Sequence, residues 1–596
     1  MSKRQQAMLR ATRHLQAREF QQALQLLAPL CPDNGPVDEA TQLLASACAR
    51  LGEHDRARAL FSRYLEHFPA NPMVWNNFGN LLKKTDPDRA LENYRRALDL
   101  KHDYPDALYN LALCQHQLED YSGALASLDR LAALAQQPRE KQLRGIVHLA
   151  LHQADKARDN FRAYLALRPA DSNGQLNLAI ALRRLGEREQ ALAVLAEAGP
   201  EAPADLRRER CALLQELGNT GAAREELQTL LAQEPLALEA HDMLDRLLFE
   251  LGDRASVGQS LRAAHLLTGD NRLLARLAQR MEQIDKPDEA AQVLARIPQQ
   301  LHDDPELLRL QARLCQRSGS PEAAAQAFAD ALQRFPNHRE LLLDATRLHI
   351  RRGELPQAEQ LIEKLLRHAP NDQEAWSYRS TIWKLSEDEC YAWLCDYQRF
   401  VGEQQLLGEG LEQDYVAELC DYLRGLHQSR HAPMDQTLRG GTQTPGALFN
   451  QPHPLIRTLV ERLQVLVGRH IEQLPDDPDH PLLGRKSKQV VFNGSWSVRL
   501  TRQGYHINHN HRLGWLSSAL YLALPPMAGG ADHAGCLQLG QSNLGLGDEQ
   551  DPPERIVVPS PGKLALFPSY LWHGTVPFQS EGERLTVAFD IVPGTP

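Results

Sequence analysis

One small residue recurs at intervals close to 34 through the first 370 residues of this 596-residue chain. It is alanine at Ala23, Ala57, Ala90, Ala124, Ala157, Ala191, Ala223, Ala290, Ala324 and Ala358, with Val257 inside the one interval of double length. A large apolar side chain often follows four residues later, as at Phe61, Tyr94, Leu128, Phe161 and Phe328. A fixed period of this length is the signature of a repeat protein, whose units stack only on their neighbours.

The composition of this region favours helices, because it is rich in Ala, Leu, Gln, Arg and Glu and poor in β-branched residues. Many units carry a proline near their end, where it can stop a second helix. These prolines are Pro69, Pro105, Pro169, Pro235, Pro336 and Pro370. The pattern resembles the tetratricopeptide repeat, a pair of antiparallel helices per unit.

We therefore expect residues 1–375 to form an all-α solenoid of about eleven units. The concave face of such a solenoid generally binds a protein or a peptide, and we expect such a partner here. The alternative is that the array serves only as a spacer.

The pattern changes after residue 375. Residues 376–430 are aromatic-rich and off the repeat register, and we expect a helical connector. Residues 431–453 are punctuated by Gly and Pro and predict a loop, with residues 436–444 covering the mouth of the next domain. Residues 454–473 show helical spacing. From residue 488 onward, roughly seven or eight short apolar runs between turn signals suggest a sandwich or a jelly roll. We expect residues 431–596 to be a mainly-β domain with flanking helices.

The overall charge and the distribution of apolar residues argue against several classes of protein. A net charge of −10 argues against a general nucleic-acid coat. No stretch approaches 18 uncharged apolar residues, so no membrane span is expected, and the start lacks the apolar core of a secretory signal. The nine cysteines form no CxxC pair and indicate reduced thiols. A cytoplasmic protein is predicted.

Three histidines lie within six positions of the C-terminal domain. On a continuous strand, His509 and His511 would point to one face and His506 to the other. Two imidazoles on one face can reach a metal ion held over a sheet. The candidate third ligand is His573, which lies beside a strand end.

This constellation resembles the double-stranded β-helix of the Fe(II)- and 2-oxoglutarate-dependent oxygenases. Their motif runs G-x4-H-x-D/E, followed by a distal His and, about ten residues later, Arg or Lys. Gly504, His509, His573 and Arg584 match this motif. Residues 430–596 look similar to a bacterial branch of these enzymes that is often fused to tetratricopeptide repeats.

The resemblance implies a dioxygenase, a hydroxylase, that uses Fe(II), 2-oxoglutarate and O₂. It implies that the Arg584 guanidinium grips the distal carboxylate of 2-oxoglutarate through a bidentate, charge-assisted pair. The Thr586 hydroxyl would be a second donor, and Tyr521 is within reach of the same carboxylate. The expected substrate is a protein or peptide recruited by the repeats, with a metabolite, a sugar or a lipid-linked glycan as alternatives.

One position departs from the motif, because His511 stands where most of these enzymes have Asp or Glu. We expect His511 to be a ligand, the alternative being a two-histidine site completed by water. A three-histidine set also suits zinc.

The sequence leaves two other functions open. One is a cupin-like metalloprotein, although Gly514 and Trp515 stand where cupins place Glu, and the other is a non-catalytic repeat scaffold with a degenerate oxygenase domain.

Overall fold

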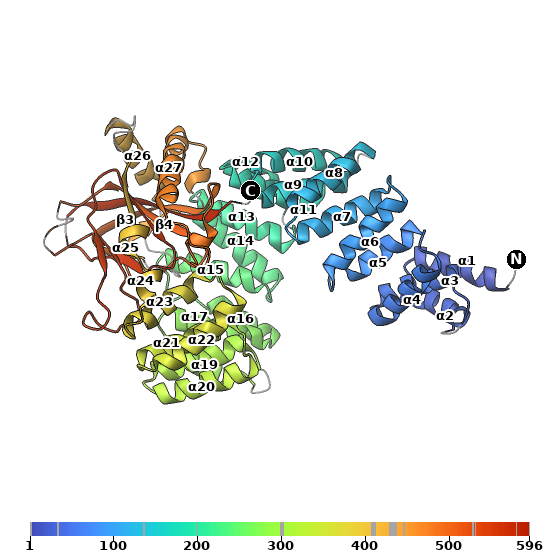
Figure 1. Cartoon of the computed structure of the whole chain (residues 1–596), viewed down its shortest axis with the longest axis horizontal. Coiled ribbons are helices and arrows are strands. Elements are labelled where there is room, and N and C mark those ends of the chain that lie inside the picture. The colour runs from blue at the N-terminus through green and yellow to red at the C-terminus, as the bar shows by residue number, and fades with distance from the viewer. Residues whose placement is uncertain are drawn as a thin grey trace. The chain divides into compact units, whose positions relative to one another are not determined.

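The computed structural model describes residues 3–32, 35–134, 137–199, 201–298, 303–406, 413–427, 438–444, 448–526, 530, 532–579 and 581–594 (Figure 1). Contacts divide the chain into two compact units. The first is Met1–Leu185 with Glu189–Ala202, and the second is Gly186–Arg188 with Pro203–Pro596.

The first unit is entirely helical within the described residues. Its helices are α1 (Lys3–Gln16), α2 (Phe20–Leu27), α3 (Glu39–Leu51), α4 (His54–His67), α5 (Pro72–Leu82), α6 (Pro87–Leu100), α7 (Pro105–Gln117), α8 (Tyr121–Leu134), α9 (Pro138–Ala150), α10 (Ala154–Leu167), α11 (Ser172–Arg184) and α12 (Arg188–Ala196), with a short 3₁₀ turn at Ala28–Leu30.

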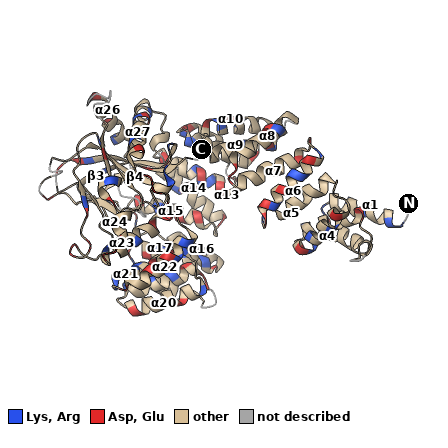
Figure 2. Cartoon of the chain, viewed as in Figure 1, with Lys and Arg blue, Asp and Glu red and all other residues tan. Residues whose placement is uncertain are grey.

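The second unit begins with eleven more helices of the same kind. They are α13 (Ala204–Glu216), α14 (Thr220–Gln233), α15 (Leu238–Glu250), α16 (Gln259–Thr268), α17 (Asn271–Gln283), α18 (Pro287–Leu294), α19 (Pro305–Arg317), α20 (Pro321–Arg334), α21 (Arg339–Arg351), α22 (Leu355–His368) and α23 (Gln373–Leu385). Figure 2 shows acidic and basic residues interspersed over the helices.

The burial of the periodic alanines confirms the predicted repeat. All ten of them have no exposed surface, and Val257 in the irregular interval is also buried. The large residues four positions later, such as Tyr94 and Phe161, are buried against the paired helix. A Cβ at Gly79 would lie 2.6 Å from the Tyr94 ring, so this glycine provides the room that the ring needs.

One proline differs from its predicted role. Pro69 and Pro336 follow the second helix of a pair, after α4 and α20, as expected. Pro105 instead occupies the first turn of α7. The reason is physical, since proline lacks only an N–H that the first turn leaves unpaired, and its fixed φ suits a helix start.

The remainder of the second unit is mainly β, which confirms the predicted fold class. Its strands are β1 (Gly402–Gln405), β2 (Leu438–Gln443), β3 (Val490–His506), β4 (Leu516–Ala523), β5 (Leu537–Leu539), β6 (Arg555–Val557), β7 (Lys563–Pro568), β8 (His573–Thr575) and β9 (Glu583–Pro593). The flanking helices are α24 (Cys390–Leu394), α25 (Tyr397–Phe400), α26 (Gln413–Leu426) and α27 (Pro454–Gln473), with 3₁₀ turns at Leu448–Asn450 and Leu483–Arg485.

The strands form two antiparallel sheets. The larger has the order β1-β7-β4-β9-β3-β2, and the smaller has the order β6-β5-β8. Strand β1, from the segment expected to be a helical connector, pairs with β7 at the edge of the larger sheet. The prediction of a loop at residues 438–443 was wrong, because this segment is strand β2 and pairs with β3. Residues 431–437 and 445–447 of the expected loop lie outside the described residues.

Alternation along β9 separates the core of the β domain from its interior cavity. Leu585, Val587, Phe589 and Ile591 are fully buried in one hydrophobic core with residues of α27 such as Leu459 and Leu463. The residues between them point to the opposite face, where a cavity holds the candidate site. Among the described helices, none has an apolar stretch long enough to cross a bilayer.

Candidate metal centre

Backbone pairing brings the candidate ligands together. His509 lies just beyond β3 and forms an isolated antiparallel bridge with His573, the first residue of β8. Each residue donates its backbone N–H to the carbonyl of the other, at 2.8 and 2.9 Å. The backbone N–H of His511 donates to the Ser569 carbonyl at 3.0 Å, which anchors the next part of the same segment.

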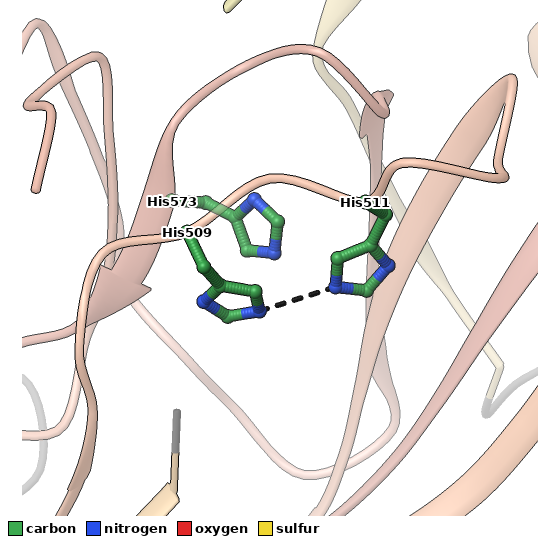
Figure 3. A group of neighbouring side chains, drawn as sticks. All are labelled: His509, His511 and His573. Atoms are coloured by element: carbon green, nitrogen blue, oxygen red, sulfur yellow. Dashed lines mark hydrogen bonds between the residues drawn. The ribbon is translucent and has the colours of Figure 1, made fainter. Parts of the chain in front are cut away.

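The three imidazoles point toward one another (Figure 3). The His509 and His573 ring centres are 4.2 Å apart, and those of His511 and His573 are 4.8 Å apart. One ring nitrogen from each residue lies within 4.8 Å of the other two. Within the described residues this is the one group of three or more His, Cys, Asp or Glu side chains that could hold a metal ion.

Each ring nitrogen Nδ1 has an acceptor of its own. His509 Nδ1 donates to the Ile507 carbonyl and His573 Nδ1 to the Leu571 carbonyl, both at 2.9 Å. His511 Nδ1 lies 2.5 Å from a carboxylate oxygen of Asp590. An imidazole that donates from Nδ1 keeps its lone pair on Nε2. His509 Nε2 and His511 Nε2 lie 3.1 Å apart, which is close enough for one cation to contact both nitrogens.

The electrostatics of the site favour neutral rings. Burial, reinforced by the neighbouring His511, lowers the pKa of His509 to about 3. Burial also holds the pKa of His573 well below its ordinary value, with further lowering by His509. Neutral imidazoles are the form that binds metals, so these side chains fit a metal ion without first losing protons at neutral pH.

The predicted orientation of His506 was wrong. Its ring centre lies 5.7 Å from that of His509, and both side chains line the same cavity. Strand β3 ends at His506, and the chain beyond it does not continue as a regular strand. The two-residue alternation on which the prediction depended therefore does not apply.

Arg584 and Thr586 line the same cavity from β9, two residues apart on one face. The Arg584 side chain is buried, and its Nε donates to the Gly535 carbonyl at 3.2 Å. No acidic side chain among the described residues pairs with this guanidinium, and burial lowers its pKa. A cation in such a place is costly unless an anion joins it.

Tyr521 lies opposite Thr586 on the neighbouring strand β4. The Arg584 guanidinium carbon is 5.0 Å from the centre of the Tyr521 ring, within the range of a cation–π contact. Tyr521 is fully buried and is not part of the described lining of the cavity. Its ring therefore lies against the Arg584 guanidinium beside the cavity.

Two residues of the site were missed by the sequence analysis. Asp590 accepts from His511 Nδ1, and the Ser517 hydroxyl donates to the same carboxylate oxygen at 2.7 Å. A signal was available, because Arg584, Thr586 and Asp590 are separated by even numbers of residues on one strand and so share a face. What the sequence could not show is that His511 lies beside Asp590, near the C-terminal end of β9.

Family comparisons bear out the predicted resemblances. A family model described as "Putative 2OG-Fe(II) oxygenase" matches residues 494–590, which include the three histidines and Arg584. Tetratricopeptide-repeat models match residues 38–81, 80–138, 143–205 and 317–381. The chain therefore carries tetratricopeptide repeats in its N-terminal and middle regions and a domain of that oxygenase family near its C-terminus.

Several solved structures are also similar to parts of the chain. A tetratricopeptide repeat protein of Parabacteroides merdae is 16% identical, with a TM-score of 0.34 over 41% of this chain and 98% of that one. Yeast Tom70 is 15% identical, with a TM-score of 0.34 over 59% of this chain and 88% of that one. The pilus biogenesis factor PilW is 21% identical, with a TM-score of 0.33 over 36% and 99%. Comparison with curated proteins gives no match.

Proposed function

We propose that the C-terminal domain is an Fe(II)- and 2-oxoglutarate-dependent oxygenase, a hydroxylase, with His509, His511 and His573 as the metal ligands. Three ligands on one side of an ion leave adjacent positions open for a cosubstrate and O₂. The bound metal would supply oxygen activation. In the overall reaction, 2-oxoglutarate, O₂ and a C–H bond give succinate, CO₂ and a C–OH group.

The observation that carries this proposal is the buried Arg584 guanidinium without an acidic partner among the described residues. 2-Oxoglutarate has a 2-oxo acid end that chelates a metal and a distal carboxylate that needs a cation. Arg584 would form a charge-assisted pair with that carboxylate, and the Thr586 hydroxyl would donate beside it. Tyr521 would support the guanidinium through its ring.

The other two candidate functions leave this charge without a role. A cupin-like metal enzyme needs no buried arginine facing its metal ligands. A non-catalytic scaffold would gain stability by replacing such a cation with an apolar residue. Trp515, where a cupin would place Glu, is fully buried and donates its indole N–H to the Leu482 carbonyl at 2.8 Å.

The repeats are proposed to recruit a protein or peptide substrate. The proposed organisation is a repeat array (residues 1–375), a connector (376–430) and the metal domain (431–596). Solenoids of this class expose an extended concave surface suited to peptides. A protein substrate would therefore meet the metal domain while bound to the array.

The test is 2-oxoglutarate binding to the Fe(II)-loaded chain without oxygen, followed by admission of O₂. We expect a visible charge-transfer band on 2-oxoglutarate addition and succinate release after O₂. The Zn(II)-loaded chain is the matched control and should give no band, because Zn²⁺ has no redox chemistry. An Fe(II)-loaded chain that gives neither band nor succinate would contradict the proposal.

A further inference from the structure

We propose that Asp590 is the acidic residue of the metal centre, acting through His511 and not as a ligand. This inference rests on the proposed function, since it assigns a positioning residue to the same site. His511 replaces the carboxylate ligand that most related enzymes have. The missing negative charge is then supplied from the far side of the His511 ring.

The contact between the two residues is short and supported. His511 Nδ1 and Asp590 Oδ1 are 2.5 Å apart, and both side chains are largely buried. The Ser517 hydroxyl donates to the same carboxylate oxygen at 2.7 Å and lies 2.8 Å from the Ser569 hydroxyl. Ser517 and Asp590 are register partners on β4 and β9, so the sheet itself fixes the carboxylate.

The other two candidate ligands provide an internal comparison. His509 and His573 direct Nδ1 to backbone carbonyls, which are neutral acceptors. Only His511, among the three, directs Nδ1 to a carboxylate. A carboxylate that accepts a hydrogen bond from Nδ1 of an imidazole fixes the tautomer and orientation of the ring. It also makes the Nε2 lone pair a stronger metal ligand.

The charges around Asp590 argue against a purely structural role. Within the described residues, the His511 imidazole is the one Lys, Arg or His side chain within ion-pair distance of Asp590. A largely buried carboxylate without Lys or Arg is costly to keep. A divalent cation on the opposite side of the His511 ring would offset that cost, because a ligand set made only of histidines brings no negative charge of its own.

The experiment titrates the metal-free full chain with Co(II) in the absence of 2-oxoglutarate and records the visible spectrum. The test variant is Asp590→Asn, which keeps the shape and an accepting oxygen but removes the charge. We expect its Co(II) affinity to fall roughly 10- to 100-fold, with a shifted spectrum. The matched control is Glu583→Gln on the same strand, whose carboxylate binds Arg424 and Arg499, and its Co(II) affinity should be unchanged.

A second variant keeps the test informative if Asp590→Asn fails to fold. Ser517→Ala leaves the carboxylate in place but removes the hydroxyl that donates to it, and a smaller loss of Co(II) affinity is expected. Unchanged affinity and spectrum in the folded variants would overturn the role of Asp590 alone. An unmodified chain that binds no Co(II) would overturn the metal site, and with it both this inference and the proposed function.

Discussion

The indole Nε1 of Trp572 donates a hydrogen bond of 2.9 Å to the hydroxyl of Thr381. Thr381 belongs to α23, the helix that follows the last repeat pair, whereas Trp572 immediately precedes the candidate ligand His573. The Ser377 hydroxyl of α23 donates at 2.6 Å to the Tyr570 carbonyl of the same loop. The helix that follows the last repeat pair therefore holds the segment that carries the candidate ligand His573.

Replacing Trp572 by Phe should weaken both the fold and the metal site. The variant keeps an apolar ring in the core shared with α21–α23, but it removes the indole N–H that donates to the Ser377 carbonyl and the Thr381 hydroxyl of α23. We expect a loss of about 1–3 kcal/mol in unfolding free energy and several-fold weaker Co(II) binding. Urea unfolding and Co(II) titration measure these two effects.

The matched control is Trp393→Phe, because the Trp393 indole donates to the exposed Asp477 carboxylate and its side chain is 38% exposed. That variant should change the unfolding free energy less and should leave Co(II) affinity unchanged. Equal Co(II) affinity in both variants would show that α23 does not position His573.

Removing a candidate ligand should abolish tight metal binding while leaving the helices intact. His509→Ala or His573→Ala deletes one of three converging nitrogens. We expect Fe(II) occupancy after anaerobic loading to fall sharply in either variant, as measured by metal analysis of the desalted protein. The helical circular-dichroism signal should stay the same, since the helices are mostly in the repeats. Iron content equal to that of the unmodified chain would refute the ligand assignment.

Periodicity in the sequence was enough to predict the repeats and most of the strands. Ala57, Ala90 and Ala324 are each wholly buried because a 34-residue period places them at the same point of every helix pair. The local sequence pattern gave a wrong prediction where pairing with a neighbouring strand decides the structure. Leu438–Gln443 contains two adjacent glycines and predicts a loop, yet the free edge of β3 makes it a strand.

The site was predictable to the extent that its residues follow a motif or an alternation. Arg584 and Thr586 share a face of β9 because they lie two residues apart on one strand. His506 was predicted to point away from His509, and this prediction was wrong because strand β3 ends where the alternation was assumed to continue. The hydrogen bond between Trp572 and Thr381 joins residues that are 191 positions apart in the sequence. No local pattern reports a contact of that separation.

Acid should destabilise the metal-free chain through buried histidines outside the metal centre. Burial lowers the pKa of His470 and of His427 to about 4, well below the usual value of an unfolded chain. Between about pH 6.5 and 4, the unfolded state therefore binds protons that the folded state does not, and stability falls as pH falls. At pH 5 the loss for the wholly buried His470 is about 2 kcal/mol relative to pH 7.

Urea unfolding at pH 7 and pH 5, followed by tryptophan fluorescence, measures this loss. The His470→Gln variant cannot take up the proton and should lose less stability over the same pH interval. If the unmodified chain and the variant respond equally to acid, His470 does not stay neutral in the folded protein.

The Arg584→Ala variant separates the proposed oxygenase from its alternatives. If the guanidinium pairs with the distal carboxylate of 2-oxoglutarate, its removal costs ~2–5 kcal/mol, or roughly 30- to 5,000-fold in cosubstrate affinity. Fe(II) binding should be nearly unaffected, since Arg584 is not among the converging histidines. Arg584→Lys should restore part of the affinity, because a point charge replaces a bidentate fork. The measurement is an anaerobic 2-oxoglutarate titration of the Fe(II)-loaded chain, followed by the visible charge-transfer band. The same midpoint for the unmodified chain and Arg584→Ala would show that the distal carboxylate of 2-oxoglutarate binds elsewhere. Removing a buried positive charge that has no acidic partner among the described residues must weaken the binding of any anion that pairs with it.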